Sequence, residues 1–172
     1  MIEIRAENAA DLAGIRQVHE QAFRPSLMEA RLVDLLRQAG AAPISLVALS
    51  EHRIVGHILF SPMTIDPAPA GAIRLLGLAP LGVLPAFQKQ AIGSALVERG
   101  LSDCRQSGCD LVAVLGNPAY YSRFGFGPAR VHGLENEYHA GDAFMLMELR
   151  PGVLQGIQGL LKYRPEFKQA GA

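Results

Sequence analysis

The sequence predicts a mixed α/β fold in which a mostly antiparallel central sheet is split between two of its strands. Short apolar segments of strand length alternate along the chain with amphipathic segments of helix length. A hairpin precedes the later strand–helix–strand units, and this order gives a sheet of mixed direction. Pro80 interrupts the most apolar strand segment, and a proline inside a sheet forces a bulge or a gap in the hydrogen-bond ladder.

The length and composition fit one globular domain. The chain has 172 residues, of which 49% are hydrophobic and 19% charged, so it can bury a sizeable core. We expect a single domain over residues 1–172, with its core at about 1–150 and a Gly-rich C-terminal extension at 151–172 whose structure the pattern does not define.

The first half of the chain predicts a strand, two helices and a hairpin. Alternating apolar and charged residues indicate the strand, and apolar residues at three- and four-residue steps indicate the helices. The first helix ends at Arg24-Pro25, and a capping box of Ser26 and Glu29 begins the second. The predicted elements are a strand at 2–5, helices at 9–23 and 26–39, and strands at 44–49 and 54–65 joined by a turn at 50–53.

The second half predicts strands and helices in alternation. Its first strand is apolar throughout and is therefore expected to be buried on both faces. A short helix is expected to stop at Gly125, and Val131 is expected to lie in a closing strand. The predicted elements are strands at 73–84, 111–115 and 144–149 and helices at 92–106 and 117–124.

Composition and charge exclude several classes of function. The 16 Lys+Arg residues balance 16 Asp+Glu residues, so the chain has no excess positive charge to bind a phosphate backbone. Aromatic residues make up only 6%, with no Trp, so few side chains are available to stack on bases. We therefore expect no nucleic-acid partner. Because a chain without net charge repels its own copies little, its composition is compatible with a homodimer.

The sequence also predicts a cytoplasmic protein with no membrane partner. The N-terminus lacks the basic-then-apolar order of a signal peptide, and the longest uncharged run, 75–88, holds two prolines and is too short to cross a bilayer. Cys104 and Cys109 make no disulfide framework and have no His at metal-ligand spacing. We expect both to be reduced, buried thiols, and we expect no metal site.

The junction between the strand at 73–84 and the helix at 92–106 is the strongest candidate for a binding site. Backbone N–H groups at a helix start have no partners within the helix, and the dipole is positive there, so the site favours a phosphate. Lys89 adds a formal charge. Upstream, the break at Pro80 leaves main-chain groups of residues 81–83 without a ladder, and an extended ligand with amide groups can pair with them.

This junction resembles the acyl-CoA signature of the GNAT acyltransferase superfamily, Q/R-x-x-G-x-G/A. The matching residues are Gln88-Lys89-Gln90-Ala91-Ile92-Gly93. Downstream, Tyr121-Ser122-Arg123-Phe124-Gly125-Phe126 is similar to the Y-x-x-x-G-F element of the same superfamily, and the run 116–126 is similar to one bacterial subgroup of predicted N-acetyltransferases. The predicted order of elements is similar over nearly the whole chain.

The resemblance implies transfer of an acetyl group from acetyl-CoA, as cosubstrate, to a primary amine of a small molecule or peptide. It implies that the pyrophosphate lies on the backbone N–H groups of residues 88–94, that the pantetheine arm lies beside residues 81–83, and that a backbone N–H near Val83 holds the oxyanion. It implies Tyr121 as the general acid that protonates the thiolate, since tyrosine is protonated at neutral pH. The implied cofactor-binding residues are Leu81, Gly82, Val83, Gln88, Lys89, Gln90, Ala91, Ile92, Gly93, Ser94, Asn117 and Tyr120.

Three features depart from the superfamily pattern. Ala91 replaces the first glycine; its methyl group is unfavourable if φ is positive but harmless in a helix, and we expect this position to be helical. Asn117 precedes Tyr121 by four residues, whereas the superfamily often has an Asn seven residues before the Tyr. The central strand has no Glu near Ala79 and Pro80, so the sequence does not identify a general base.

Other polar residues have simpler interpretations. His19, on the apolar side of the first helix, is expected to be packed or partly exposed, and His57, in a strand, to be a buried structural residue. A polar loop with Glu135, Glu137 and His139 could receive a cationic amine but is expected to be solvated. Arg24, between the first two helices, could border the acceptor site.

Two other functions stay open. One is a catalytically idle acyl-CoA-binding module of the same fold, for which Ala91 and the missing base would be the signs of lost turnover. The other is an unrelated small nucleotide-binding domain that uses the same helix start. The absence of G-x-x-x-x-G-K-S/T and G-x-G-x-x-G runs argues against the nucleotide-binding domain.

Overall fold

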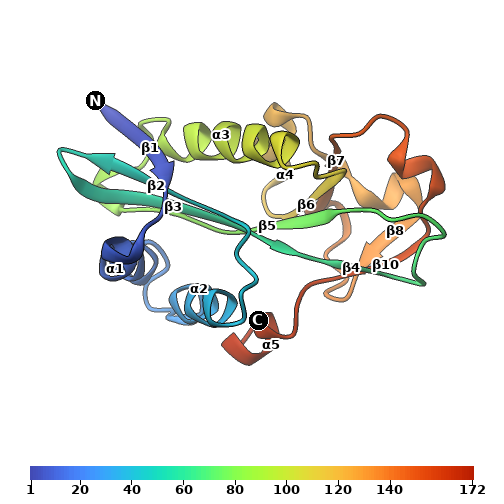
Figure 1. Ribbon diagram of the computed structural model, residues 1–172, viewed down its shortest axis with the longest axis horizontal. Coiled ribbons are helices and arrows are strands. Elements are labelled where there is room, and N and C mark those ends of the chain that lie inside the picture. The colour runs from blue at the N-terminus through green and yellow to red at the C-terminus, as the bar shows by residue number, and fades with distance from the viewer. The chain divides into compact units, whose positions relative to one another are not determined.

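The computed structural model describes residues 1–172 and divides them into two compact units, each built from segments far apart in the sequence (Figure 1). The first unit holds residues 1–61, 79–103 and 165–172, and the second holds residues 62–78 and 104–164. Strand β5 (Leu75–Val83) belongs to the second unit up to Leu78 and to the first from Ala79 onward.

The first unit is built on antiparallel strands with helices on both faces. Strand β2 (Ile44–Ser50) pairs with β1 (Ile2–Ala6) and with β3 (Arg53–Pro62). Figure 1 shows α3 (Ile92–Gln106) on one face of these strands and α1 (Leu12–Ala22) and α2 (Met28–Gln38) on the other. The short C-terminal helix α5 (Glu166–Ala170) packs against α2 and so ties the chain end to this unit.

Glycines set the close approach of helices to these strands. A Cβ atom at Gly56 of β3 would lie 3.0 Å from Leu96 Cδ1 of α3, and one at Gly100 of α3 would lie in contact with the ring of Phe60. On the other face, a Cβ atom at Gly14 of α1 would lie 2.9 Å from Ile54 Cδ1. Because glycine has no side chain, the helices pack closely against the strands at these contacts and the core is well filled.

The second unit holds one parallel and several antiparallel pairs. The first half of β5 runs parallel to β6 (Leu111–Leu115), while β9 (Phe144–Glu148) pairs antiparallel with β6 and with β7 (Gly127–Pro128). A separate three-stranded sheet joins β4 (Thr64–Asp66), β10 (Gly159–Lys162) and β8 (Leu134–Asn136). The short helix α4 (Pro118–Tyr121) continues as a 3-10 turn to Phe124, and Gly125 ends it at φ +104°.

The ladder between β5 and β6 ends where the sequence predicts a gap. Its last pair joins Leu78 to Val114, directly before Ala79 and Pro80, whereas β6 stays paired with β9 as far as Leu115. Proline has no N–H to donate, which explains why the ladder stops there. The prediction of a mostly antiparallel sheet that splits at Pro80 agrees with this arrangement.

The helix at 92–106, the strand at 111–115 and the hairpin turn are confirmed. The turn residues Glu51 and His52 both have positive φ, at 47° and 64°. Two left-handed residues match the right-handed twist of a two-residue hairpin, so the turn forms without Asn-Gly.

Two predictions about strands were wrong. The expected strand at 54–65 ends at Pro62, and Thr64–Asp66 pairs instead with β10. Val131 lies in the 3-10 turn Ala129–His132 and is 68% exposed, so it belongs to no strand. The extension after residue 150 contributes β10 and α5, which pair or pack with segments distant in sequence and therefore leave no local pattern.

None of the helices is long and apolar enough to cross a membrane.

Candidate active site

The loop between β5 and α3 supplies the main-chain groups of the candidate cofactor site. After Val83 the chain makes a 3-10 turn at Pro85–Phe87, and α3 begins at Ile92. The N–H of Ala95 donates to the Ala91 carbonyl at 3.0 Å and opens the hydrogen-bond ladder of the helix. The N–H groups of the preceding turn lie outside that ladder, at the positive end of the helix dipole.

The backbone of this loop twice enters the left-handed region. Lys89 has φ 61° and Ala91 has φ 63°. Such turns point main-chain N–H groups into a concave, anion-binding arrangement. The expectation that Ala91 is helical was wrong, because α3 starts one residue later and Ala91 takes the conformation that favours glycine. A left-handed L-residue costs about 1–2 kcal/mol, so the methyl group strains the loop.

Side chains fasten the loop to the end of β5. The Gln88 side-chain amide donates to the Val83 carbonyl at 3.0 Å, and the Gln90 amide donates to the Ala86 carbonyl at 3.2 Å. Both side chains thus fold back on the loop itself, which leaves ligand binding to its backbone. Lys89 is exposed and carries the positive charge of the loop.

The last residues of β5 are held on one side only. The Leu84 N–H donates to the Val55 carbonyl of β3 at 2.8 Å. Leu81 and Val83 are half-buried, whereas Gly82 is buried against the rings of His19 and Phe23. The gap in the β5–β6 ladder lies just upstream, so this stretch can accept an extended ligand as a neighbouring strand.

Tyr121 lies in the second unit at the end of α4, and two features fix its ring. The ring lies edge-on to Phe126 at 5.8 Å between centroids, and a Cβ atom at Gly116 would come within 2.5 Å of Tyr121 Cε2. Burial, with a smaller contribution from Tyr120, raises the pKa of the Tyr121 hydroxyl well above its ordinary value. The group therefore holds its proton at neutral pH, as a general acid must.

The neighbours of Tyr121 have structural contacts of their own. Asn117 caps α4, since its side-chain oxygen accepts from the Ala119 N–H at 2.9 Å. The Tyr120 ring lies edge-on to that of Tyr121, and the Arg123 guanidinium lies 4.7 Å from the Tyr120 ring centroid. The predicted contact of Asn117 and Tyr120 with the cofactor stays a prediction.

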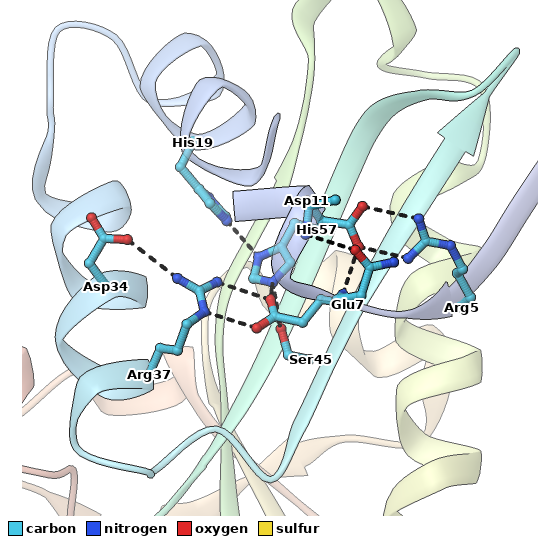
Figure 2. Close-up of polar contacts among 10 residues, drawn as sticks. Arg5, Glu7, Asp11, His19, Asp34, Arg37, Ser45 and His57 are labelled. Carbon is cyan, nitrogen blue, oxygen red and sulfur yellow. Dashed lines mark hydrogen bonds and ion pairs between the residues drawn. The ribbon is translucent and has the colours of Figure 1, made fainter. Parts of the chain in front are cut away.

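A buried polar cluster in the first unit was missed from the sequence (Figure 2). His19 and His57, both fully buried, join ring nitrogens at 2.8 Å, and the chain of contacts continues through Ser45 to Glu7 and Arg37. The two histidines were expected to be packed or structural residues. The only sequence signal for the contact between the two histidines is that each occupies an apolar position, His19 in a helix and His57 in a strand. Nothing in the sequence links either histidine to Glu7.

The other polar candidates have contacts of their own. Cys104 and Cys109 are buried free thiols, as expected, and a hydrogen bond with Cys104 is the main cause that lowers the Cys109 pKa to about 7. In the second unit, Glu135 and His139 line a cavity of about 160 Å³. The Glu137 carboxylate accepts from the Tyr163 N–H at 3.1 Å, so it holds the C-terminal segment in place.

Comparison with known proteins shows the family to which the chain belongs. Residues 3–129 match the family described as "Acetyltransferase (GNAT) domain". The chain is 34% identical over 168 residues to the uncharacterized N-acetyltransferase YhbS of Escherichia coli K12, which covers 96% of this chain and 98% of YhbS. It is 38% identical over 120 residues to the uncharacterized N-acetyltransferase YjhQ of the same strain, which covers 69% of this chain and 66% of YjhQ.

Two solved structures share the fold over nearly the whole chain. The Escherichia coli YhbS structure in complex with CoA has a TM-score of 0.90 and 33% identity, and the alignment covers 97% of this chain and 92% of that one. A GNAT family acetyltransferase from Brucella melitensis in complex with acetyl-CoA has a TM-score of 0.80 and 37% identity, with 97% and 98% covered. The fold class and the resemblance predicted from the sequence are confirmed: the chain belongs to the GNAT acetyltransferase family.

Proposed function

We propose that this protein is an N-acetyltransferase that moves an acetyl group from acetyl-CoA to a primary amine of a small molecule or peptide. The observation that supports this proposal best is the strained loop before α3, where left-handed Lys89 and Ala91 precede a helix start, an arrangement that favours anion binding. The membership of the chain in the GNAT family and the CoA complexes of its relatives support CoA as the ligand of this loop.

The backbone of residues 88–94 is proposed to bind the pyrophosphate, with Lys89 adding charge. The pantetheine arm is proposed to pair with Leu81, Gly82 and Val83, where β5 has left its ladder with β6. The Leu84 N–H points to β3, where it donates to the Val55 carbonyl, and successive N–H groups of a strand point to opposite edges, so the strand offers the Val83 N–H to the oxyanion. A fixed N–H aimed at the developing charge contributes strongly to catalysis of acyl transfer.

The proposed reaction is direct attack of a neutral amine on the thioester carbonyl. As the tetrahedral intermediate collapses, the carbon–sulfur bond breaks and the CoA thiolate takes the proton of the Tyr121 hydroxyl. The Tyr121 hydroxyl keeps its proton at neutral pH until the thiolate forms beside it. The sequence offers no carboxylate on β5 to deprotonate the amine.

Calorimetry with CoA, acetyl-CoA, ATP and NAD tests the cofactor proposal. We expect heat for CoA and acetyl-CoA only, and binding of ATP alone would refute the cofactor proposal.

A second assay follows thiol release from acetyl-CoA with amino acids, polyamines, aminosugars, arylamines and short peptides as acceptors. Binding of acetyl-CoA without thiol release for any amine would instead support the idle acyl-CoA-binding module, a function that the strain at Ala91 favours.

A further inference from the structure

The cluster in Figure 2 begins at an ion pair between α2 and the segment after β1. Arg37 donates from Nε and Nη2 to the two oxygens of Glu7, at 2.9 Å and 3.0 Å. Ser45 Oγ donates to Glu7 Oε2 at 2.6 Å. Burial alone would raise the pKa of Glu7, but hydrogen bonds with His57, Arg37 and Ser45 hold it well below its ordinary value. Glu7 is therefore ionised and accepts every one of these bonds.

The ionised Glu7 determines the direction of each hydrogen bond that follows. Ser45 gives its only proton to Glu7, so its oxygen accepts from His57 Nε2, which lies at 2.8 Å. Burial lowers the pKa of His57, and a neutral ring that donates from Nε2 carries a lone pair on Nδ1. That lone pair accepts from His19 Nε2 at 2.8 Å.

His19 closes the chain with a nitrogen that has no partner. Burial, with the charges of His57 and Arg37 as smaller causes, lowers the pKa of His19 well below its ordinary value, so its ring is neutral and Nδ1 carries a lone pair. Nδ1 is fully buried and has no hydrogen-bond donor. An unpaired buried acceptor is costly, and a catalytic role is one of the explanations for such a group in a native protein.

This lone pair faces β5 at the stretch where the thioester is proposed to bind. A Cβ atom at Gly82 would lie 2.9 Å from His19 Nδ1, so the nitrogen packs directly against the glycine backbone of the strand. The rings of Phe23 and His57 hold the imidazole from two other sides, at centroid distances of 5.9 Å and 5.0 Å.

The opposite end of the chain reaches a cavity. Glu7 and Ser45 line a hollow of about 350 Å³ together with residues 42–44. The Glu7 side chain is 17% exposed, whereas His19 and His57 are fully buried. The contacts thus form a continuous path of proton-carrying groups from a buried lone pair at Gly82 to a surface hollow.

We propose that His19 is the general base of the acetyl transfer and that His57, Ser45 and Glu7 form its proton relay. This inference rests on the proposed function. The amine N–H bond breaks as its nitrogen bonds to the acetyl carbon, and the proton bonds to His19 Nδ1. The His19 Nε2 proton then shifts toward His57 Nδ1, and the His57 Nε2 proton toward Ser45 and Glu7, from which a proton leaves to the cavity.

The charged groups around the relay favour a base that is neutral at rest. Arg37 from α2 opposes a positive charge on either ring, and Asp34 of the same helix bonds Arg37 at 3.4 Å. Glu7 and, more weakly, Asp11 favour a positive charge on His57. The neutral ring can therefore take a proton, and Glu7 stabilises the charge once it arrives.

Nitrogen-15 NMR of the histidine rings tests the relay without any acceptor amine. At neutral pH we expect both buried histidines as neutral Nε2–H tautomers, each with a bare Nδ1. A proton on His19 Nδ1, or a charged His19, would overturn the proposal, because no lone pair would then face Gly82. This result is independent of whether the protein transfers acetyl groups.

The variant His19→Gln tests the base itself, because its amide can still donate to His57 while it cannot accept a proton at neutral pH. With the fastest amine of the thiol-release assay, we expect kcat to fall by about 10²–10⁴-fold at pH 7, with an unchanged KM for acetyl-CoA. The loss should shrink as the pH rises and the amine deprotonates in solution. The matched control His52→Gln, in the exposed hairpin turn, should behave as wild type.

The outcomes separate this inference from the proposed function. Wild-type protein that releases no thiol with any amine contradicts the proposed function. Active wild-type protein together with a His19→Gln variant of equal kcat and equal pH profile contradicts only the relay. If His19→Gln does not fold, His57→Gln serves instead, with an expected smaller loss of kcat, and wild-type rates for that variant would likewise overturn the relay.

Discussion

Ala91 shows what a one-letter motif leaves open. The signature predicts a strand–loop–helix junction at 88–93, and the structure has one there. Ala91 could be either the first residue of the helix or the last residue of the loop. The two alternatives differ by one position, and hydrophobic periodicity does not locate a helix end that closely. The left-handed φ of Ala91 decides it, and it converts a harmless substitution into a strained one.

We predict that Ala91→Gly stabilises the folded protein. Relief of about 1–2 kcal/mol of left-handed strain exceeds the cost of about 0.4–1 kcal/mol that a glycine adds through the unfolded chain. Urea denaturation should show a higher midpoint with an unchanged slope. Ala95→Gly, the same change inside α3, is the control and should destabilise by about 1 kcal/mol. A midpoint for Ala91→Gly that falls as far as that of Ala95→Gly would contradict the strain.

Gly116 is the second residue whose role only the structure shows. We predict that Gly116→Ala lowers kcat toward the level of Tyr121→Phe, itself expected to lose about 10²–10⁴-fold, with little change in acetyl-CoA affinity. The new methyl group would lie 2.5 Å from Tyr121 Cε2, so the ring must move away from its position. Thiol release measures kcat, and calorimetry measures affinity.

The control for this change is Gly127→Ala, where a Cβ atom meets nothing within 4 Å. We expect that variant to keep the wild-type kcat. Should Tyr121→Phe itself leave kcat unchanged, Tyr121 is not the general acid, and the Gly116 variant loses its interpretation.

Among the helices and strands, those with a clear local sequence pattern were predicted best. The helix Ile92–Gln106 and the strand Leu111–Leu115 have the expected bounds because each carries its own periodicity or apolar run. The three-residue strands Thr64–Asp66 and Leu134–Asn136 were missed because only pairing with β10 makes them strands. Val131 was misplaced for the opposite reason, because it is an apolar residue that the fold leaves 68% exposed.

The contact between α3 and β3 gives an element-scale prediction. Gly100→Ala should destabilise the protein by about 1–3 kcal/mol, because a Cβ atom would overlap the buried ring of Phe60 and push the helix off the strand. Helix propensity alone predicts the opposite sign, a gain of about 1 kcal/mol. Urea denaturation therefore decides between packing and propensity by the sign of the change, and a stabilised variant would contradict the close contact.

At the scale of the whole molecule, the sequence predicted the fold and the parts of the candidate site that lie in its motifs. The loop at 88–94 and Tyr121 each sit on an element with a clear pattern. The relay could not be predicted, because Glu7, His19, Ser45 and His57 come from four separate segments that only folding joins. The same residues make the stability of the molecule depend on pH.

We predict that the free energy of unfolding is level above pH 6.5 and falls as the pH drops below it. The folded state keeps His19 and His57 neutral, with pKa values below the ordinary 6.5, whereas the unfolded chain protonates both. Each histidine that only the unfolded chain protonates lowers stability by about 1.4 kcal/mol per pH unit.

Glu7 adds to this loss at lower pH. Its folded pKa lies below the ordinary 4.5, so the stability it contributes is present above 4.5 and is lost as the pH falls further. Denaturation midpoints measured from pH 8 to pH 4 give the profile, and His57→Gln should flatten the limb that starts at pH 6.5. A wild-type profile that stays level down to pH 5 would show that the folded protein protonates its two buried rings as readily as the unfolded chain does, which is incompatible with a neutral base at His19.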